Sequence, residues 1–328
     1  MELALWTVAL CLLVTHIRPL TWARKATGRA QRSIRVASVG LLLILAVLLA
    51  ASGAYSFWIA HRPLPGNTRQ VVFEGITYIR EVRRSPRPIV IHVMRVELDA
   101  PGIRFLVTPG DPSPEDEIRA RTTSQFVAEF DLQVAINGDF FTPWWSYGPW
   151  DYYPRVGDPI DVKGFASSNG AVYSGGESND GPTLYLSAGN QASFDVPIGS
   201  VYNAISGNTI FLEDGVARVE PPEYHFEPHP RTAIALDRAR RTLILVVVDG
   251  RQPNYSEGIS LAELAQILRD YGGDTALNLD GGGSTTMVIE GDNGEPVILN
   301  SPIDNLIPGR ERPVANHLGI YAHPASAP

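Results

Sequence analysis

The turn Asn278-Leu279-Asp280-Gly281-Gly282-Gly283-Ser284 places a carboxylate and a hydroxyl on either side of three consecutive glycines. Each glycine costs roughly 0.5 to 1 kcal/mol relative to alanine, because glycine loses more backbone entropy on folding. Such a backbone lets a ligand approach closely and aims successive N–H groups at an anion. We therefore predict an anion site made by Gly281, Gly282, Gly283 and Ser284 beside a reactive Asp280. The alternative is a tight hairpin turn. The turn is not an ATP-binding P-loop, because it lacks the Gly-Lys-Ser/Thr ending.

Two further segments carry charged residues next to expected strands. Asp249-Gly250-Arg251 follows the apolar run 242–248, where a charge pair is costly unless a partner or ligand satisfies it. Arg231 begins another expected strand, and a guanidinium can bind a phosphate through two hydrogen bonds. Asp249, Arg251 and Arg231 are therefore candidate site residues. The alternatives are a surface turn with a salt bridge and an arginine paired with an acid.

An aromatic segment supplies a candidate sugar-binding surface. Within ten residues it contains Trp144, Trp145, Tyr147, Trp150, Tyr152 and Tyr153, without the period of a strand or a helix. Exposed aromatic faces stack on sugar rings and on cations. We predict a loop that partly covers a ligand, with Trp144 and Trp145 as contacts. The histidines show no metal-ligand spacing and are expected to be structural.

Two similar helix-strand units precede the candidate residues. A helix capped by Thr122 or Thr123 leads to a strand at 132–136 and then to Asn137. A second helix, opened by a capping box at 260–263, leads to a strand at 275–279 and the glycine turn. Segments 135–139 and 276–280 share three of five residues, so we expect the two strand ends to converge on one site.

The remaining pattern indicates an α+β fold, a strand-rich mixed-sheet domain with few helices. The continuous apolar run 242–248 is typical of a central strand buried on both faces. Asp292-Asn293-Gly294 predicts a hairpin turn. Further strands are expected at 71–80, 89–98, 183–186, 208–212, 232–236, 285–289, 297–300 and 316–321.

Charge and hydropathy predict a membrane protein with an acidic outer domain. Residues 36–60 carry no charge and are long enough to cross a bilayer, and basic residues precede them. We therefore expect a basic cytoplasmic loop within residues 1–35 and a transmembrane helix at 36–60. A linker at 61–67, an extracytoplasmic domain at 68–322 and a tail at 323–328 would follow. Residues 61–328 carry 21 Lys/Arg and 34 Asp/Glu, which argues against a nucleic-acid partner. No pattern indicates an oligomeric state.

The N-terminal apolar stretch 3–17 is open to two interpretations. It is either a first membrane span, which would form a hairpin with the basic loop inside, or a segment that does not span. The chain's one cysteine, Cys11, lies in this stretch. The outer domain therefore has neither a disulfide nor thiol chemistry.

Several motifs occur in order along the outer domain: Asn137-Gly138 with Phe140-Phe141, 230–234, 246–251, Gly258 with 261–268, 278–284 and 311–316. Together they resemble the phosphodiester glycosidase family over residues 70–322, and the bacterial relatives often labelled exopolysaccharide proteins resemble the chain best. The resemblance implicates Asn137, Arg231, Asp249, Asp280, the 281–283 backbone, Ser284, Arg312 and Asn316. Asp139 stands where the family usually has glycine, and Glu257 falls at a variable position, so neither role is implied.

The resemblance suggests hydrolysis of a sugar-1-phosphodiester outside a membrane. The phosphate would be held by Arg231, Arg251 and the glycine turn. The first candidate for the base or nucleophile is Asp280, and the second is Asp249. Asn137 would orient the sugar or the water. In one alternative, a divalent cation bridging Asp280 and Asp249 promotes P–O cleavage, and the sequence does not identify the cofactor. In another, the domain is a non-catalytic glycan-binding module of an exopolysaccharide system.

Overall fold

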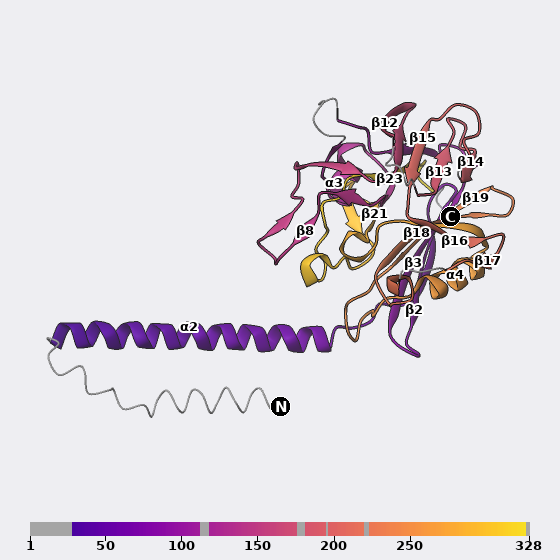
Figure 1. Cartoon of the computed structure of the whole chain (residues 1–328). Coiled ribbons are helices and arrows are strands. Elements are labelled where there is room, and N and C mark those ends of the chain that lie inside the picture. The colour runs from indigo at the N-terminus through magenta and orange to yellow at the C-terminus, as the bar shows by residue number, and fades with distance from the viewer. Residues whose placement is uncertain (1–27, 112–117, 176–180, 195, 220–222, 326–328) are drawn as a thin grey trace. The chain divides into compact units, whose positions relative to one another are not determined.

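The computed structural model describes residues 28–111, 118–175, 181–194, 196–219 and 223–325. The stretch 3–17, with Cys11, lies outside the described residues. The chain divides into two compact units, residues 1–60 and 61–328 (Figure 1).

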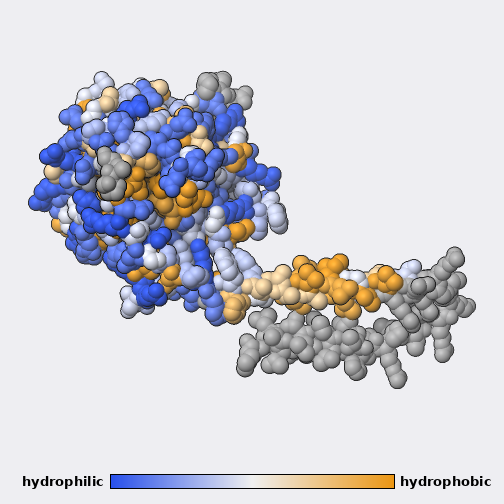
Figure 2. Space-filling model, turned by 180° about the vertical axis from the view of Figure 1, so that it is seen from behind, coloured by the Kyte–Doolittle hydropathy of each residue, from blue (hydrophilic) through white to orange (hydrophobic). Residues whose placement is uncertain are grey.

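The first unit contains one long helix, α2 (Gly28–Ala60). Its segment Val36–Ile59 is long and apolar enough to cross a membrane. At 1.5 Å per residue, 24 residues extend about 36 Å, against about 30 Å for bilayer hydrocarbon. The space-filling view shows hydrophobic surface along this helix (Figure 2). The apolar segment predicted at 36–60 is thus helical, as a span requires.

The second unit is built on an eight-stranded sheet in which every neighbouring pair is antiparallel. The strands, in sheet order, are β1 (Thr68–Phe73), β2 (Ile76–Arg83), β3 (Ile89–Glu97), β19 (Thr242–Val248), β18 (Arg231–Asp237), β20 (Gly273–Asn278), β16 (Thr209–Glu213) and β17 (Val216–Ala217). The predicted strand at 242–248 is confirmed as β19 and lies between β3 and β18.

A five-stranded antiparallel sheet shares a core with the first sheet. Its strands, in order, are β22 (Pro296–Ile298), β21 (Met287–Glu290), β6 (Val134–Asn137), β23 (His317–Tyr321) and β4 (Arg104–Val107). The turn predicted at 292–294 joins β21 to β22 in the expected hairpin. Helix α3 (Thr123–Glu129), capped by Thr122, packs Phe126 and Val127 against the other face of this sheet.

Shorter strands complete the domain. A second five-stranded sheet contains β12 (Ala171–Gly175), β11 (Phe165–Ser168), β15 (Asn203–Ser206), β13 (Thr183–Leu186) and β14 (Ala192–Phe194). A three-stranded sheet contains β5 (Ile118–Arg119), β10 (Pro159–Val162) and β7 (Phe141–Thr142), and a ribbon pairs β8 (Trp145–Ser146) with β9 (Tyr152–Tyr153). Single 3₁₀ turns lie at η2 (Glu223–His225), η3 (Gly282–Ser284) and η4 (Asp304–Leu306).

Alternating side chains of β19 fill two separate cores. Leu243, Leu245 and Val247 pack toward the five-stranded sheets. Ile244, Val246 and Val248 pack toward helix α4 (Leu261–Asp270). Because successive strand residues face opposite sides, an unbroken apolar run suits a strand covered on both faces. The α+β, strand-rich fold predicted from the sequence is therefore confirmed. The predicted mixed sheet is wrong, because neighbouring strands in the described sheets all pair antiparallel.

One predicted strand is wrong in its extent. The segment 71–80 was expected to be a single strand, but a turn at Glu74 and Gly75 divides it between β1 and β2. Gly75 has a φ of +74°, and an added Cβ would overlap Ala100. The pattern of apolar residues continued through the turn, so hydropathy alone did not reveal the hairpin.

The packing of α4 generates a stability prediction. Leu268 is completely buried against the eight-stranded sheet, whereas Gln266 lies on the exposed face of the same helix. Leu268→Ala should lower the free energy of unfolding by about 2–5 kcal/mol, because it leaves a cavity. Gln266→Ala should change it by less than about 0.5 kcal/mol. Urea denaturation of both variants makes the comparison, and equal midpoints would contradict the packing.

Candidate active site

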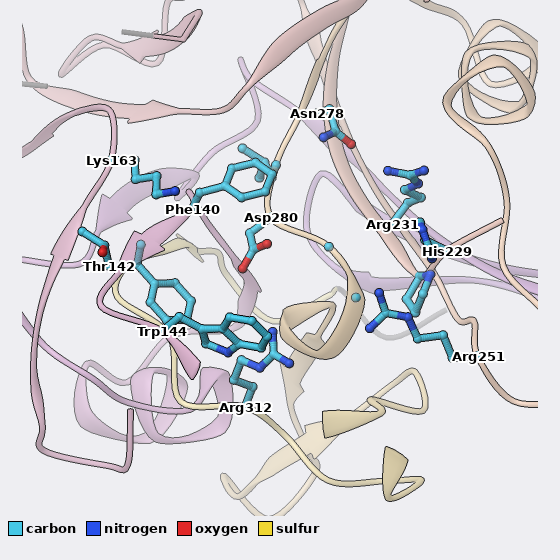
Figure 3. Close-up of a pocket in the computed structure, with 15 residues that line it drawn as sticks. Phe140, Thr142, Trp144, Lys163, His229, Arg231, Arg251, Asn278, Asp280 and Arg312 are labelled. Carbon is cyan, nitrogen blue, oxygen red and sulfur yellow. The ribbon is translucent and has the colours of Figure 1, made fainter. Parts of the chain in front are cut away.

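A cavity of about 440 Å³ opens at the end of β20. It is bordered by the glycine turn, by Arg251 and Arg312, by Lys163 and by Trp144. Asp280 lies near the centre of the group in Figure 3. Cationic side chains thus surround a single lining carboxylate, an arrangement that suits a ligand with a negative charge.

The two strand ends predicted to converge do meet at this cavity. The Asn137 Nδ2 donates to the carbonyl oxygen of Asp280 at 2.7 Å, and the Asp280 N–H donates to the Gly138 carbonyl at 3.0 Å. The Asn137 Oδ1 accepts from the Thr232 hydroxyl and the Thr286 N–H. Because Asn137 is fully buried and outside the cavity lining, it positions Asp280 and does not face a ligand.

The Asp280 carboxylate is enclosed by protein although part of the residue opens onto the cavity. Burial raises its pKa. The positive charge of Arg312, hydrogen bonds from the Ser284 hydroxyl and the Gly281 N–H, and the charge of Lys163 lower it in part. A carboxylate with a raised pKa is a better proton acceptor than an exposed aspartate.

The glycines allow two guanidinium groups to pack against the turn. Gly282 has a φ of +62°, and a Cβ there would lie 2.9 Å from the Arg251 Nη1. A Cβ on Gly283 would overlap the guanidinium of Arg312. A Cβ on Gly281 would lie 2.8 Å from the Pro230 carbonyl oxygen. The structural reason for three glycines is therefore close approach by neighbouring groups of the protein.

The predicted N–H anion cradle is largely taken up by internal hydrogen bonds. The N–H of Gly282 donates to the Pro230 carbonyl, and those of Ser284 and Thr285 donate to the carbonyls of Gly281 and Gly282. The Gly281 N–H donates to the Asp280 carboxylate. Anion binding at this turn therefore falls mainly to the two arginines.

Arg312 is held from two sides. Its Nε donates to the Asp304 Oδ1 at 2.8 Å, and its Nη1 donates to the Ser284 hydroxyl at 3.3 Å. Its guanidinium also lies 5.0 Å from the centre of the Trp144 ring. Asp304 is nearly fully buried, so this ion pair fixes the position of the guanidinium and of the tryptophan.

Arg251 lacks such a partner. In the described part of the chain no hydrogen bond or ion pair joins its guanidinium to another side chain. Burial and the nearby charge of Arg312 lower its pKa, and Asp280 raises it. Arg251 and Arg312 are neighbouring cations that repel each other, and among the described residues no acid pairs with Arg251. An anion bound between the two guanidinium groups would therefore be stabilised.

The two predicted tryptophans have different surroundings. Trp144 borders the cavity and is half exposed. Trp145 does not border it and stacks on Tyr153 with ring centres 4.6 Å apart. The aromatic ribbon is braced by Arg310, which lies over Tyr152, and by a hydrogen bond from Ser146 to Asn305. Trp144 is thus the residue placed to stack on a ligand.

Asp249 does not border the cavity. It is 1% exposed, and its Oδ1 accepts from the Asn300 Nδ2 at 3.0 Å and the Ser301 N–H at 2.8 Å. Its Oδ2 lies 3.4 Å from the Nε2 of His92, which in turn bonds to Tyr78. These contacts tie the end of β19 to the segment after β22. Its role in the structure is therefore to hold strands together.

The donor set does not fit a divalent cation at Asp280. Within the described ranges, no group of three or more His, Cys, Asp or Glu side chains is placed to hold a metal. Both Asp249 oxygens already accept hydrogen bonds, and Lys163, Arg251 and Arg312 give the Asp280 side of the cavity a positive charge. A bridge between Asp280 and Asp249 would have to break those bonds.

Two other predicted residues support the site from beneath. Arg231 borders the cavity but is 4% exposed, and it donates to the carbonyls of Ile259 and Glu227. Asn316 is fully buried and outside the lining, and its Oδ1 accepts from the Asp139 N–H at 2.8 Å. Glu257, to which the resemblance assigned no role, is exposed and outside the lining.

Asp139 is a buried carboxylate beneath the site. Its Oδ1 accepts from the Phe140 N–H at 2.7 Å and its Oδ2 from the Gly164 N–H at 2.8 Å. Burial raises its pKa to about 7, and the nearby Asp280 adds to this, while the two backbone hydrogen bonds oppose it. The bond to Gly164 fixes the backbone next to Lys163, which reaches the cavity.

Lys163, Asn278 and His229 border the cavity and were missed as ligand contacts. Lys163 comes from the turn between β10 and β11, where nothing in its neighbours indicates a site. Burial lowers the pKa of His229, with help from Arg251 and Arg231. Asn278 could have been found, because it lies two residues before Asp280 and strand residues at that spacing share a face.

Comparison with known proteins identifies a family and a shared fold. The family model for phosphodiester glycosidase matches residues 130–321. A hypothetical protein from Synechocystis has a similar fold, with a TM-score of 0.55 and 17% identity over 79% of this chain; the match covers 64% of that protein, somewhat less than two thirds. The catalytic domain of zebrafish N-acetylglucosamine-1-phosphodiester alpha-N-acetylglucosaminidase, auto-inhibited by its pro-peptide, has a TM-score of 0.53 and 20% identity over 81% of this chain and 86% of that one. Comparison with curated protein sequences finds no significant match.

The close packing at the glycine turn predicts that Gly283→Ala weakens anion binding. The new methyl group must displace the Arg312 guanidinium, which is anchored to Asp304. Loss of one charge-assisted contact should weaken binding of inorganic phosphate by about tenfold or more, measured by titration calorimetry. Gly175→Ala is the matched control, because its Cβ meets open space. Equal affinities for phosphate in the two variants would show that Arg312 does not contact the anion.

The buried Asp139 predicts a pH dependence of stability. In the folded chain the Asp139 carboxyl group keeps its proton up to its pKa of about 7, whereas in the unfolded chain it loses the proton near pH 4. The unfolded state therefore binds fewer protons between these values, and the free energy of unfolding falls as pH rises, by on the order of 4 kcal/mol. Asp280 contributes in the same direction.

Asp139→Asn should flatten this slope. The asparagine loses one backbone hydrogen bond, so the variant should be less stable at pH 5, and the difference should shrink as pH rises to 8. Urea denaturation across this range makes the measurement, with the exposed Asp151→Asn as control. If the free energies of unfolding of wild type and Asp139→Asn change in parallel with pH, the raised pKa of Asp139 is contradicted.

Proposed function

The chain belongs to the phosphodiester glycosidase family, and we propose that it hydrolyses sugar-1-phosphodiesters. The observation that carries the proposal is one carboxylate, Asp280, in a cavity bordered by Lys163, Arg251 and Arg312. A phosphodiester is a monoanion that these cations can bind. The cavity also offers the face of Trp144 to a sugar ring.

In the proposed reaction, the bond between the anomeric carbon and the bridging oxygen breaks. Water supplies the new hydroxyl of the sugar, and the phosphate leaves as a monoester that keeps the bridging oxygen and takes up a proton. Arg251 and Arg312 stabilise the charge that develops on this leaving group. Because a phosphate is already a good leaving group, a strong general acid is less necessary than in ordinary glycoside hydrolysis.

Asp280 acts on the sugar side of this bond. Its raised pKa suits a general base that takes a proton from water, and its carboxylate also has the chemistry of a nucleophile. Arg312, Ser284 and the Gly281 N–H hold the carboxylate in place. Asn137 positions the Asp280 backbone, and we assign Asp249 and Asn316 to the support of the site rather than to the chemistry.

We further propose that α2 anchors the enzyme and that the domain lies outside the membrane. The support is the run of basic residues that precedes the apolar segment Val36–Ile59. A cysteine introduced in the domain, as in Ser187→Cys, should then react in intact cells with a thiol reagent that cannot cross membranes. Labelling only after cell lysis would show that the domain lies on the cytoplasmic side of the membrane.

Replacing the carboxylate is the direct test of catalysis. Asp280→Asn should lower kcat for a sugar-1-phosphodiester by about a thousandfold or more while binding of the sugar phosphate is retained. In the wild type, activity should fall as pH drops through the raised pKa of Asp280, so the acid limb should lie above that of an exposed aspartate. Binding without any product from the wild type would instead identify a glycan-binding module.

Water labelled with ¹⁸O tests which bond breaks. Cleavage at the anomeric carbon places the label in the sugar hydroxyl, and cleavage of the P–O bond places it in the phosphate. We expect the label in the sugar, detected by mass spectrometry of the separated products. Label in the phosphate would overturn the assignment of Asp280 to the sugar side.

A further inference from the structure

Asn278, at the border of the cavity, carries a hydrogen-bond acceptor that the proposed reaction does not use. Asn278 is the last residue of β20, is 2% exposed and borders the cavity. Its Oδ1 has no hydrogen-bond partner among the described residues. A buried carbonyl oxygen without a partner is uncommon in native proteins, and a bound ligand is one way to satisfy it.

The geometry of the strand aims Asn278 at the same space as Asp280. Side chains two residues apart on an extended strand share a face. Leu279, between them, instead packs into the core below the sheet. Figure 3 shows Asn278 and Arg312 on opposite sides of Asp280. A ligand that reaches Asn278 from Asp280 therefore extends away from Arg312.

A second asparagine pairs with the nitrogen of the Asn278 amide. The Asn278 Nδ2 donates to the Asn208 Oδ1 at 2.7 Å. The Asn208 Nδ2 lies 3.4 Å from the Nε2 of His225, which accepts its hydrogen in the tautomer protonated at Nδ1. In that tautomer the order of donors and acceptors leaves the Asn278 carbonyl oxygen for the ligand. Asn208 is thus a positioning residue.

The chemistry of the unpaired atom restricts what can lie beside it. An ionised phosphodiester has only acceptor oxygens and cannot satisfy a carbonyl oxygen. The cations Arg251 and Arg312 suit the phosphate, so the group at Asn278 must belong to another part of the substrate. That group has to supply an O–H or N–H hydrogen.

We propose that Asn278 is a specificity-determining residue that accepts a hydrogen bond from a hydroxyl or N-acyl amide of the sugar. This inference uses the substrate class of the proposed function and adds the requirement for a donor on the sugar. A phosphodiester whose sugar lacks that donor leaves the carbonyl unpaired and is rejected. Sites that hydrogen-bond a substrate group discriminate strongly against analogues without it.

The test compares sugars that lack one donor at a time. The probes are the methyl diesters of glucose-1-phosphate, of N-acetylglucosamine-1-phosphate and of the 2-, 3-, 4- and 6-deoxy forms of the former. In the wild-type full chain, removal of one particular donor should lower kcat/KM by about 10- to 100-fold. In Asn278→Leu the same removal should cost less than about threefold, because the acceptor is gone. Equal penalties at every position in both proteins overturn the proposal.

Two further variants separate this role from a structural one. Asn278→Asp keeps an acceptor and should keep the deoxy penalty even if Asn278→Leu folds poorly. Asn208→Ala should weaken the penalty because the Asn278 amide can rotate, and Asn208→Asp should restore it because its carboxylate still accepts from the Asn278 Nδ2. If Asn208→Asp does not restore the penalty, the positioning role of Asn208 is contradicted.

Binding distinguishes failure of this inference from failure of the proposed function. Titration calorimetry measures the affinity of the full chain for glucose-1-phosphate, its four deoxy forms and N-acetylglucosamine-1-phosphate, with no reaction required. If no diester is cleaved but loss of one donor weakens binding about 10-fold, and only when Asn278 is present, the enzymatic proposal fails and Asn278 keeps its role. If neither parent sugar phosphate binds, or all forms bind alike, the role of Asn278 is disproved.

Discussion

The close packing of Arg251 and Arg312 against a backbone without Cβ atoms is the constraint on which the cavity depends. A side chain at Gly282 or Gly283 would occupy the space of a guanidinium. Arg312 can take this place because Asp304 and Ser284 hold it, whereas Arg251 depends on the shape of the turn. The entropic cost of three glycines is thereby offset by room for two cations beside Asp280, of which Arg312 is fixed by Asp304 and Ser284.

The same turn joins the two main sheets. Asn137, at the end of β6 in one sheet, donates to the carbonyl of Asp280, which follows β20 in the other. Gly138 accepts from the Asp280 N–H, and a Cβ at Gly138 would overlap Asn316. The position of Asp280 is therefore set by hydrogen bonds between sheets, and movement of one sheet against the other would displace it.

Charge in the site is arranged in two layers. Lys163, Arg251 and Arg312 border the cavity, while Asp139 and Asp304 lie buried behind them. Asp304 pairs with Arg312, and Asp139 holds the backbone beside Lys163. The buried acids thus place the cations without neutralising the cavity, whose positive charge contrasts with the net acidity of residues 61–328.

Local sequence determined the features that depend on near neighbours. The capping boxes at Thr122 and Ser260, the two-faced strand β19 and the glycine turn with Asp280 follow from residue types within a few positions. The short strands between residues 140 and 206 were largely missed, because two to five residues carry too little periodicity. Only the tertiary structure decided that Lys163 faces the cavity and that Asp249 does not. Those positions depend on contacts between segments tens of residues apart, such as Asp249 with Ser301 and Asp139 with Gly164 beside Lys163, which no local pattern encodes.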